Sequence, residues 1–208
     1  MDGRTYGDGC GVARALDAVG ERWALLVVRE LLLGPKRFTD LHRGLGTMSQ
    51  NVLTQRLRDL EQAGVVERYR LRPPAGSWVY ELTDAGAQLE PVLIALGNWG
   101  RLRPMHDDTV FSQDALLLAL RTTFDPVAAE GLNLVLDLRL PDDQLELAVV
   151  DGTLTMTRCA AEDADVILDT DPITLRELAF GTSTVADVPA EGDKRSLQRL
   201  FDAFVHTR

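Results

Sequence analysis

The chain has 208 residues and a formal net charge of -10, a length that suits one large or two modest domains. No apolar run is long enough for a membrane span, and the N-terminus lacks the apolar stretch of a signal peptide. The two cysteines, Cys10 and Cys159, give neither a disulfide framework nor the spacing of a metal site. We therefore expect a cytoplasmic protein without a membrane partner, metal or cofactor.

The negative charge is concentrated in the second half of the chain. Residues 1–104 contain 14 Lys and Arg against 12 Asp and Glu, whereas residues 105–208 contain 8 against 20. Affinity for nucleic acid depends on local basic clusters that displace counterions from phosphates. The overall acidity therefore does not exclude a nucleic-acid surface on the first half.

Three helices are expected before residue 64. An apolar helix from Trp23 to Leu33 ends at Gly34-Pro35, and a short helix follows with Thr39 as its N-cap. After a turn at residues 45–48, a helix runs from Ser49, its N-cap, to Ala63, with Gly64 suited to the left-handed position beyond its end. Its core side chains are expected to be Leu53, Leu57 and Leu60, and its other faces carry Gln50, Asn51, Thr54, Gln55 and Arg58.

A hairpin follows this helix. Residues 65–72 and 78–82 are strand-like, and a break rich in proline and glycine separates them. One arm carries Arg68, Arg70 and Arg72. A single helix capped by Thr83 is then expected to run through Leu89, Leu93, Leu96 and Trp99. This order is that of a winged helix-turn-helix, in which the third helix enters the major groove of DNA and the wing touches the backbone.

Several motifs extend the match beyond this order of elements. Residues 10–16, 20–26, 29–31, 34–38, 53–61 and 80–83, with Gly86, resemble the HxlR-type family of bacterial regulators over about residues 8–102. Gly11 departs from the family, which often has proline there. The resemblance implies a non-enzymatic, dimeric transcription regulator whose helix from Ser49 to Ala63 reads double-stranded DNA.

We expect the DNA contacts to fall into two groups. Bases would be read by Gln50, Asn51, Thr54 and Gln55, with Arg58 at a base or a phosphate. Phosphates would be held by Lys36, Arg37, Thr39, Ser49, Arg70, Arg72 and Ser77. Arg56 is open to a plainer interpretation, as a helix residue paired with acidic neighbours. A homodimer would place two reading helices about 34 Å apart on a pseudo-palindromic operator. Its core, or that of the domain, would contain Trp23, Leu26, Leu96 and Trp99.

The second half predicts an α+β domain at residues 113–208, joined to the domain at 1–104 by a linker at 105–112. A helix begun by Ser112 or Asp114 precedes three strands in a meander and a fourth at residues 165–170. Asp171-Pro172 starts a helix, a last strand is expected at residues 185–188, and a final amphipathic helix follows Gly192-Asp193. These elements would form an antiparallel sheet with helices on one face.

This order, with residues 165–172 and 191–193, resembles the sterol-carrier-protein-2-like fold. The resemblance implies an apolar tunnel for a lipid-like ligand between sheet and helices, which would make this half either an effector-binding module or a carrier. The candidate lining is Leu134, Leu136, Leu138, Leu147, Met156, Leu175, Leu178, Phe201 and Phe204. The alternative interpretation is a closed core. The acidic half would then mediate protein contacts or limit non-specific DNA binding by repulsion.

No catalytic constellation is present in the sequence. His42, His106 and His206 have no nucleophile at a suitable spacing, and no glycine-rich phosphate loop occurs. Cys10 is the one reactive candidate, because some members of the resembled family sense oxidants or electrophiles through a cysteine at this place. Arg14, one helical turn on, would favour its thiolate. The alternative is a small buried hydrophobe in a dimer-forming helix.

Overall fold

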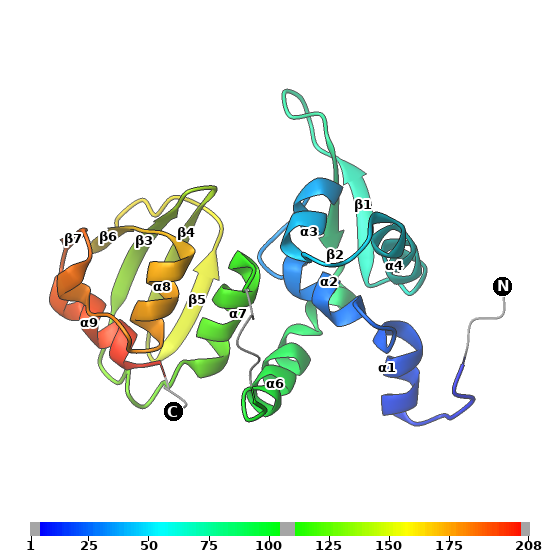
Figure 1. The fold of residues 1–208 in the computed structure, drawn as a ribbon, viewed down its shortest axis with the longest axis horizontal. Helices are drawn as coiled ribbons and strands as arrows, with labels where there is room; N and C mark the ends of the chain where they lie inside the picture. Colours follow the sequence, from blue (N-terminus) through cyan, green and yellow to red (C-terminus); the bar gives the residue numbers. More distant parts are fainter. Residues whose placement is uncertain (1–4, 105–110, 205–208) are drawn as a thin grey trace. The chain divides into compact units, whose positions relative to one another are not determined.

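The computed structural model describes residues 5–104 and 111–204, which form two compact units, Met1–Leu96 and Gly97–Arg208 (Figure 1). The division falls inside a helix, and residues 105–110 of the expected linker lie outside the described residues. Within the described parts of the chain, no helix is long and apolar enough to cross a membrane.

The first unit is a winged helix-turn-helix. Its elements in chain order are α1 (Gly11–Val19), α2 (Ala24–Leu31), α3 (Phe38–Gly44), α4 (Gln50–Gln62), β1 (Val66–Arg70), β2 (Trp78–Leu82), α5 (Asp84–Ala87) and α6 (Glu90–Gly100), which crosses the division between the units. The strands form an antiparallel hairpin, the wing, whose tip projects beyond the helices (Figure 1). Lys36 pairs through its backbone with Tyr80, so the segment before α3 lies against the free edge of β2.

Helix α4 begins and ends as its sequence predicts. The Ser49 hydroxyl accepts from the Val52 amide at 3.4 Å, and Gly64 adopts a φ of +70° just beyond the helix. Leu53, Leu57 and Leu60 are buried against the rest of the unit. This local chemistry fixes which side of α4 faces the core and, by exclusion, which side faces outward.

Two expectations for the first unit are wrong. Thr39 is not an N-cap, because α3 begins at Phe38 and Arg37, two residues before Thr39, occupies the capping position without a side-chain hydrogen bond. The helix capped by Thr83 is not continuous: it forms α5, and α6 begins after a break at residues 88–89. Pro91 explains the break, because proline has no amide proton for a helical hydrogen bond and its ring clashes with the preceding turn.

The second unit is an α+β domain. Its elements are α7 (Gln113–Thr123), β3 (Leu134–Leu140), β4 (Asp143–Val150), β5 (Thr153–Thr157), β6 (Val166–Asp169), α8 (Pro172–Ala179), β7 (Ala190–Gly192) and α9 (Lys194–Asp202). The sheet order is β5-β4-β3-β6-β7. Figure 1 shows α8 and α9 lying across one face of this sheet. The expected caps are present: Ser112 starts α7, Asp171 starts α8 and Asp193 starts α9.

The sheet is mixed, which corrects the expectation of an antiparallel one. After β5 the chain passes β4 and β3 and adds β6 on the far side of β3, parallel to it. Asp165 fixes this placement, because its carboxylate accepts from the Val135 amide and its own amide donates to the Val135 carbonyl, each at 2.8 Å. The strand expected at residues 185–188 is also wrong: Val185–Asp187 is a 3-10 turn and the last strand starts at Ala190.

The nine candidate ligand-lining residues form the core between sheet and helices. None retains more than 4% of its accessible surface, so in this structure they line no opening to solvent. Phe204 lies just beyond α9 and packs edge-on against Phe124, with ring centroids 6.0 Å apart. These contacts describe a packed core, and the ligand-binding role of these residues stays a prediction.

Candidate nucleic-acid interface

The side of α4 opposite its buried leucines carries four exposed polar side chains. They are Asn51, Gln55, Arg58 and Gln62, which recur at helical spacing and form what we call the exposed stripe. Ser49 and Gln50 are exposed at the start of the helix, and Thr54, half-buried, donates to the Gln50 carbonyl at 2.8 Å. The stripe offers amide and guanidinium groups, which match the hydrogen-bonding edges of base pairs.

Asp59 orders two neighbours on α4. Its carboxylate accepts from the Gln55 amide at 2.7 Å and from the Arg56 guanidinium at 2.9 Å. A second ion pair joins Arg56 to Glu21 at 3.6 Å, and the side chain of Arg56 is only 11% exposed. Arg56 is therefore paired with acidic neighbours, as the plainer interpretation of the sequence held, while Gln55 is held in place on the exposed stripe.

Lys36 is largely buried and ion-paired within the first unit, and its expected contact with a phosphate stays a prediction. Its ammonium contacts the Glu30 carboxylate at 2.9 Å, and Arg29 contacts the other oxygen at 2.8 Å. Glu30 is completely buried, and the Lys36 side chain is 13% exposed. Gly44 packs directly on this carboxylate, since a Cβ there would lie 2.2 Å from Glu30 Oε2. The cluster therefore joins α2, α3 and the segment that is paired with β2.

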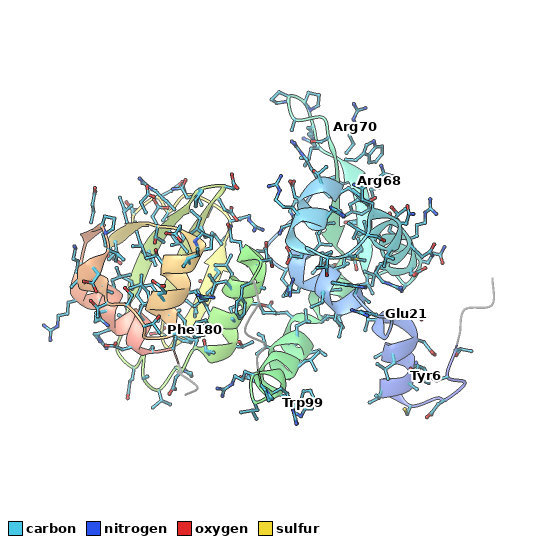
Figure 2. The ribbon with its side chains drawn as sticks, viewed as in Figure 1. Tyr6, Glu21, Arg68, Arg70, Trp99 and Phe180 are labelled. Carbon is cyan, nitrogen blue, oxygen red and sulfur yellow. The ribbon has the colours of Figure 1, made fainter. Side chains whose placement is uncertain are left out.

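The other expected phosphate contacts lie at the surface of the first unit. Arg37 and Thr39 are exposed at the start of α3, and Arg72 is exposed beyond β1. Arg70 donates from Nε to the Gly76 carbonyl at 2.7 Å, and Ser77 is half-buried. Figure 2 labels Arg70 on the wing.

Arg68 is a further candidate on the wing that is not among the DNA contacts expected from the sequence. Its guanidinium carbon lies 4.6 Å from the ring centroid of Trp78 and 5.7 Å from that of Tyr80, within the range of cation–π attraction. Strand alternation could have found it, because residues 68 and 70 share one face of a strand whose partner supplies aromatic residues.

Cys10 caps the first turn of α1. Its sulfur accepts from the Ala13 amide at 3.3 Å, and its own amide donates to Asp8. Both Cys10 and Cys159 are free and exposed. In the described residues, no group of His, Cys, Asp and Glu side chains could hold a metal ion.

Buried charges of the second unit are paired. Arg158 contacts Asp114 at 3.0 Å and Asp143 at 2.6 Å. Asp137 is 2% exposed. Burial favours its neutral form, but hydrogen bonds from Gln144, Arg139 and the Ala161 amide, with the Arg139 charge, hold its pKa below the ordinary value. These groups have the partners that buried charges need for stability and form no open site.

Comparison with known proteins identifies the first unit. A family model described as HxlR-like helix-turn-helix matches residues 18–108. The HTH-type transcriptional regulator YdeP of Bacillus subtilis (strain 168) is 37% identical over 95 residues, which are 45% of this chain and 73% of YdeP. The chain belongs to the HxlR-like helix-turn-helix family. Rv3095 of Mycobacterium tuberculosis (strain ATCC 25618 / H37Rv), another HTH-type transcriptional regulator, is 40% identical over 93 residues, 45% of this chain and 58% of that protein.

Two solved structures are similar to about half of this HxlR-family chain. PA1607, described as a putative transcription factor, has 35% identity and a TM-score of 0.45 over 50% of this chain and 72% of its own. The reduced form of the transcriptional regulator YodB from B. subtilis has 33% identity and a TM-score of 0.41 over 45% and 92%. The names of the sequence relatives confirm the expectation of a non-enzymatic transcriptional regulator. The family match ends at residue 108, so the sterol-carrier-like resemblance of the second unit stays a prediction.

Proposed function

We propose that this HxlR-family regulator binds a pseudo-palindromic operator in double-stranded DNA as a homodimer, with α4 in the major groove. The observation that carries the proposal is the exposed stripe of α4. Asn51, Gln55 and Arg58 point away from the core on a helix whose first turn is open to solvent. Side-chain amides pair with adenine and arginine pairs with guanine in the major groove, where a helix fits.

Basic residues on both sides of α4 support the same placement. Arg37 precedes α3, and Arg70 and Arg72 lie on the wing; all three are exposed. Phosphate contacts from such residues position a protein on the duplex and supply affinity that falls as salt rises. Because chromosomal DNA is the target, the proposal places the protein in the cytoplasm.

Exposed apolar residues on the first unit support a homodimer. Val12 and Leu16 of α1 are 70% and 42% exposed, and Val92 and Leu96 of α6 are 50% and 46% exposed. Of the residues we expected in a dimer or domain core, Leu26, Leu96 and Trp99 are exposed and Trp23 is half-buried. Burial of such side chains against a second copy would be favourable at about 25 cal/mol per Å². Each copy would then present one α4 to successive turns of DNA.

Selection of binding sites from random-sequence DNA tests the proposal. Full-length protein is expected to enrich a site with two inverted halves, whose centres are about one helical turn apart. The mass of the complex should correspond to two chains on one duplex. Enrichment of a site without inverted symmetry, or a complex of one chain, would contradict the dimeric arrangement. Failure to enrich any sequence would contradict operator recognition altogether.

A second candidate function is control by oxidants or electrophiles through Cys10. The observation that favours it is an exposed thiol at the first turn of α1, the helix whose exposed apolar side chains the dimer would cover. Modification there would disturb α1 and lower DNA affinity. Diamide should weaken operator binding by the wild type and by the control Cys159→Ser, but not by Cys10→Ser. Loss of affinity by all three proteins would exclude Cys10 as the sensor.

The second unit is the subject of another regulatory proposal, in which an apolar ligand bound there controls DNA binding. The alternative is that the second unit carries such a ligand. Both require the buried residues around Leu136 and Phe201 to separate, because these side chains are packed in this structure. Native mass spectrometry of the purified protein should then show a retained apolar molecule. Protein that carries no such molecule, and whose operator affinity is unchanged by added fatty acids, would exclude both roles for that class of ligand.

A further inference from the structure

The wing has two faces of opposite character. Because side chains alternate along a strand, the pairs Arg68 with Tyr80 and Arg70 with Trp78 share one face of the hairpin. The pairs Glu67 with Glu81 and Tyr69 with Val79 share the other. We call these the cationic face and the acidic face. Their register is fixed by the antiparallel pairing of β1 with β2.

Arg68 is preorganised on the cationic face. Its guanidinium lies over Trp78 and beside Tyr80, with 4.6 Å and 5.7 Å to the two ring centroids. Among the described residues it forms no hydrogen bond or ion pair, so its N–H groups are available to a ligand. Trp78 is 52% exposed, which is unusual for so large an apolar side chain and places the stack at the surface.

A hydrogen bond stabilises the tip of the wing, and acidic residues distinguish its two faces. Arg70 donates from Nε to the Gly76 carbonyl at 2.7 Å and so ties the turn to the strand. On the acidic face, two glutamates lie directly opposite each other. Tyr69 lies with them, and burial, together with the hydrogen bond and charge of Glu81 and the charge of Glu67, raises its pKa. Negative charge on that face would be repelled by phosphates, so the cationic face is the one that DNA can approach.

We infer that Arg68, positioned by Trp78 and Tyr80, enters the minor groove beside the operator half-site and selects flanks with a narrow, A·T-rich groove. The inference rests on the proposed operator binding and adds a specificity-determining residue to it. A narrow minor groove has an enhanced negative potential that attracts arginine. A planar guanidinium already held by stacking loses little freedom on entering it. A phosphate contact would be indifferent to flank sequence, and this difference makes the inference testable.

The experiment measures affinity of the full chain for one selected operator with three kinds of flank. The flanks are A·T, G·C and inosine·cytosine, the last of which keeps the major-groove edges of G·C but lacks the guanine amino group in the minor groove. Wild-type protein is expected to bind the A·T and inosine·cytosine flanks at least about fivefold more tightly than G·C. Inosine·cytosine flanks that behave like G·C would overturn minor-groove entry.

Two substitutions test whether the preference for particular flanks depends on Arg68 and on its stacking against Trp78. Arg68→Lys keeps the charge but loses the planar fork, and it should reduce the flank preference to less than about twofold. Trp78→Leu removes the stacking surface and should reduce the preference by about two- to fivefold while Arg68 is still present. Arg37→Lys, on the exposed start of α3, is the matched control and should leave the ratio between flanks unchanged. An undiminished preference in Arg68→Lys would overturn the inference.

The outcomes separate this inference from the proposed function. Wild-type protein that binds no DNA sequence selectively would refute the proposed function. Wild-type protein that binds its operator with two chains, but with equal affinity for all three flanks, would refute only the role of Arg68. Arg68 is exposed, and the fold of each variant can be verified from its unfolding transition.

Discussion

Replacement of Gly44 by alanine tests whether the buried Glu30 cluster holds the helix-turn-helix together. A Cβ at residue 44 would lie 2.2 Å from Glu30 Oε2 and 2.8 Å from its Cδ, much closer than atoms can pack. The carboxylate is fully buried and is held by Lys36 and Arg29 at 2.9 and 2.8 Å, so it cannot move without disturbing these contacts. Relief of the clash must therefore lengthen at least one of these ion pairs.

Two opposing contributions set the expected change in the free energy of unfolding. Breaking a buried ion pair costs about 3–5 kcal/mol, and the lower part of that range applies because Lys36 and Arg29 retain 13% and 18% of their side-chain exposure. Alanine forms helix more readily than glycine, and this preference offsets up to about 1 kcal/mol of that cost. We expect Gly44→Ala to reduce the free energy of unfolding by about 2–3 kcal/mol.

Denaturant unfolding followed by tryptophan fluorescence provides the assay. The three tryptophans, at residues 23, 78 and 99, all precede the second unit's sheet, and protein concentration is kept equal because a dimer's stability depends on it. Gly11→Ala, where a Cβ meets nothing within 4 Å, is the control and should change stability by less than about 1 kcal/mol. In a Glu30→Ala background, Gly44→Ala should cost almost nothing. An equal cost in both backgrounds would refute the role assigned to the carboxylate.

Two further predictions concern acid stability and assembly. The lowered pKa of Asp137 means that its ionised form stabilises the fold above about pH 4 and that this contribution is lost as the pH falls through the folded-state pKa. Asp137→Asn should therefore destabilise by about 1–3 kcal/mol at pH 7, and by progressively less as the pH is lowered below about 4, in denaturant unfolding; a loss independent of pH would contradict this. Leu16→Asp, on the exposed face of α1, should shift the protein to monomers in sedimentation velocity and weaken operator binding, whereas Ile173→Asp on α8 should do neither. A monomeric wild type would exclude this interface.

Features set by neighbouring residues could be predicted from the sequence. Ser49, Thr83, Asp171 and Asp193 cap helices where their spacing to the apolar periodicity placed them. The Asp151-Gly152 pair is typical of a two-residue hairpin turn, and it connects β4 to β5 with φ values of +49° and +73°. In each case the decisive hydrogen bond or backbone preference lies within four residues of the signal.

Features that depend on residues distant in the sequence could not be predicted from it. Lys36 and Arg37 form a basic pair, which is typical of a phosphate-binding segment. In the structure the Lys36 ammonium forms an ion pair with the buried Glu30, six residues earlier in the chain. The parallel pairing of β6 with β3 depends on the order of strands in space, which alternation of apolar residues does not encode. Strand alternation indicates the face that Arg68 shares with Arg70, but the stacking of Arg68 on Trp78 and Tyr80 depends on the register between the two strands. The base-reading roles of Gln50, Asn51, Thr54 and Gln55 depend on DNA and stay predictions.

The measurement that tests the central claim most directly compares operator and non-specific DNA for the double variant Asn51→Ala and Gln55→Ala. Both side chains lie on the exposed stripe of α4, so their removal should leave the fold intact. Gln62→Ala provides the matched control on the same stripe at the far end of the helix.

Reading of bases by α4 predicts a loss of about 1–3 kcal/mol for each lost base contact on the operator and little change on non-specific DNA. The Gln62→Ala control should bind both DNAs like the wild type, because residues near the start of a recognition helix make the base contacts. Equal losses on operator and non-specific DNA for the double variant would contradict base reading by this helix.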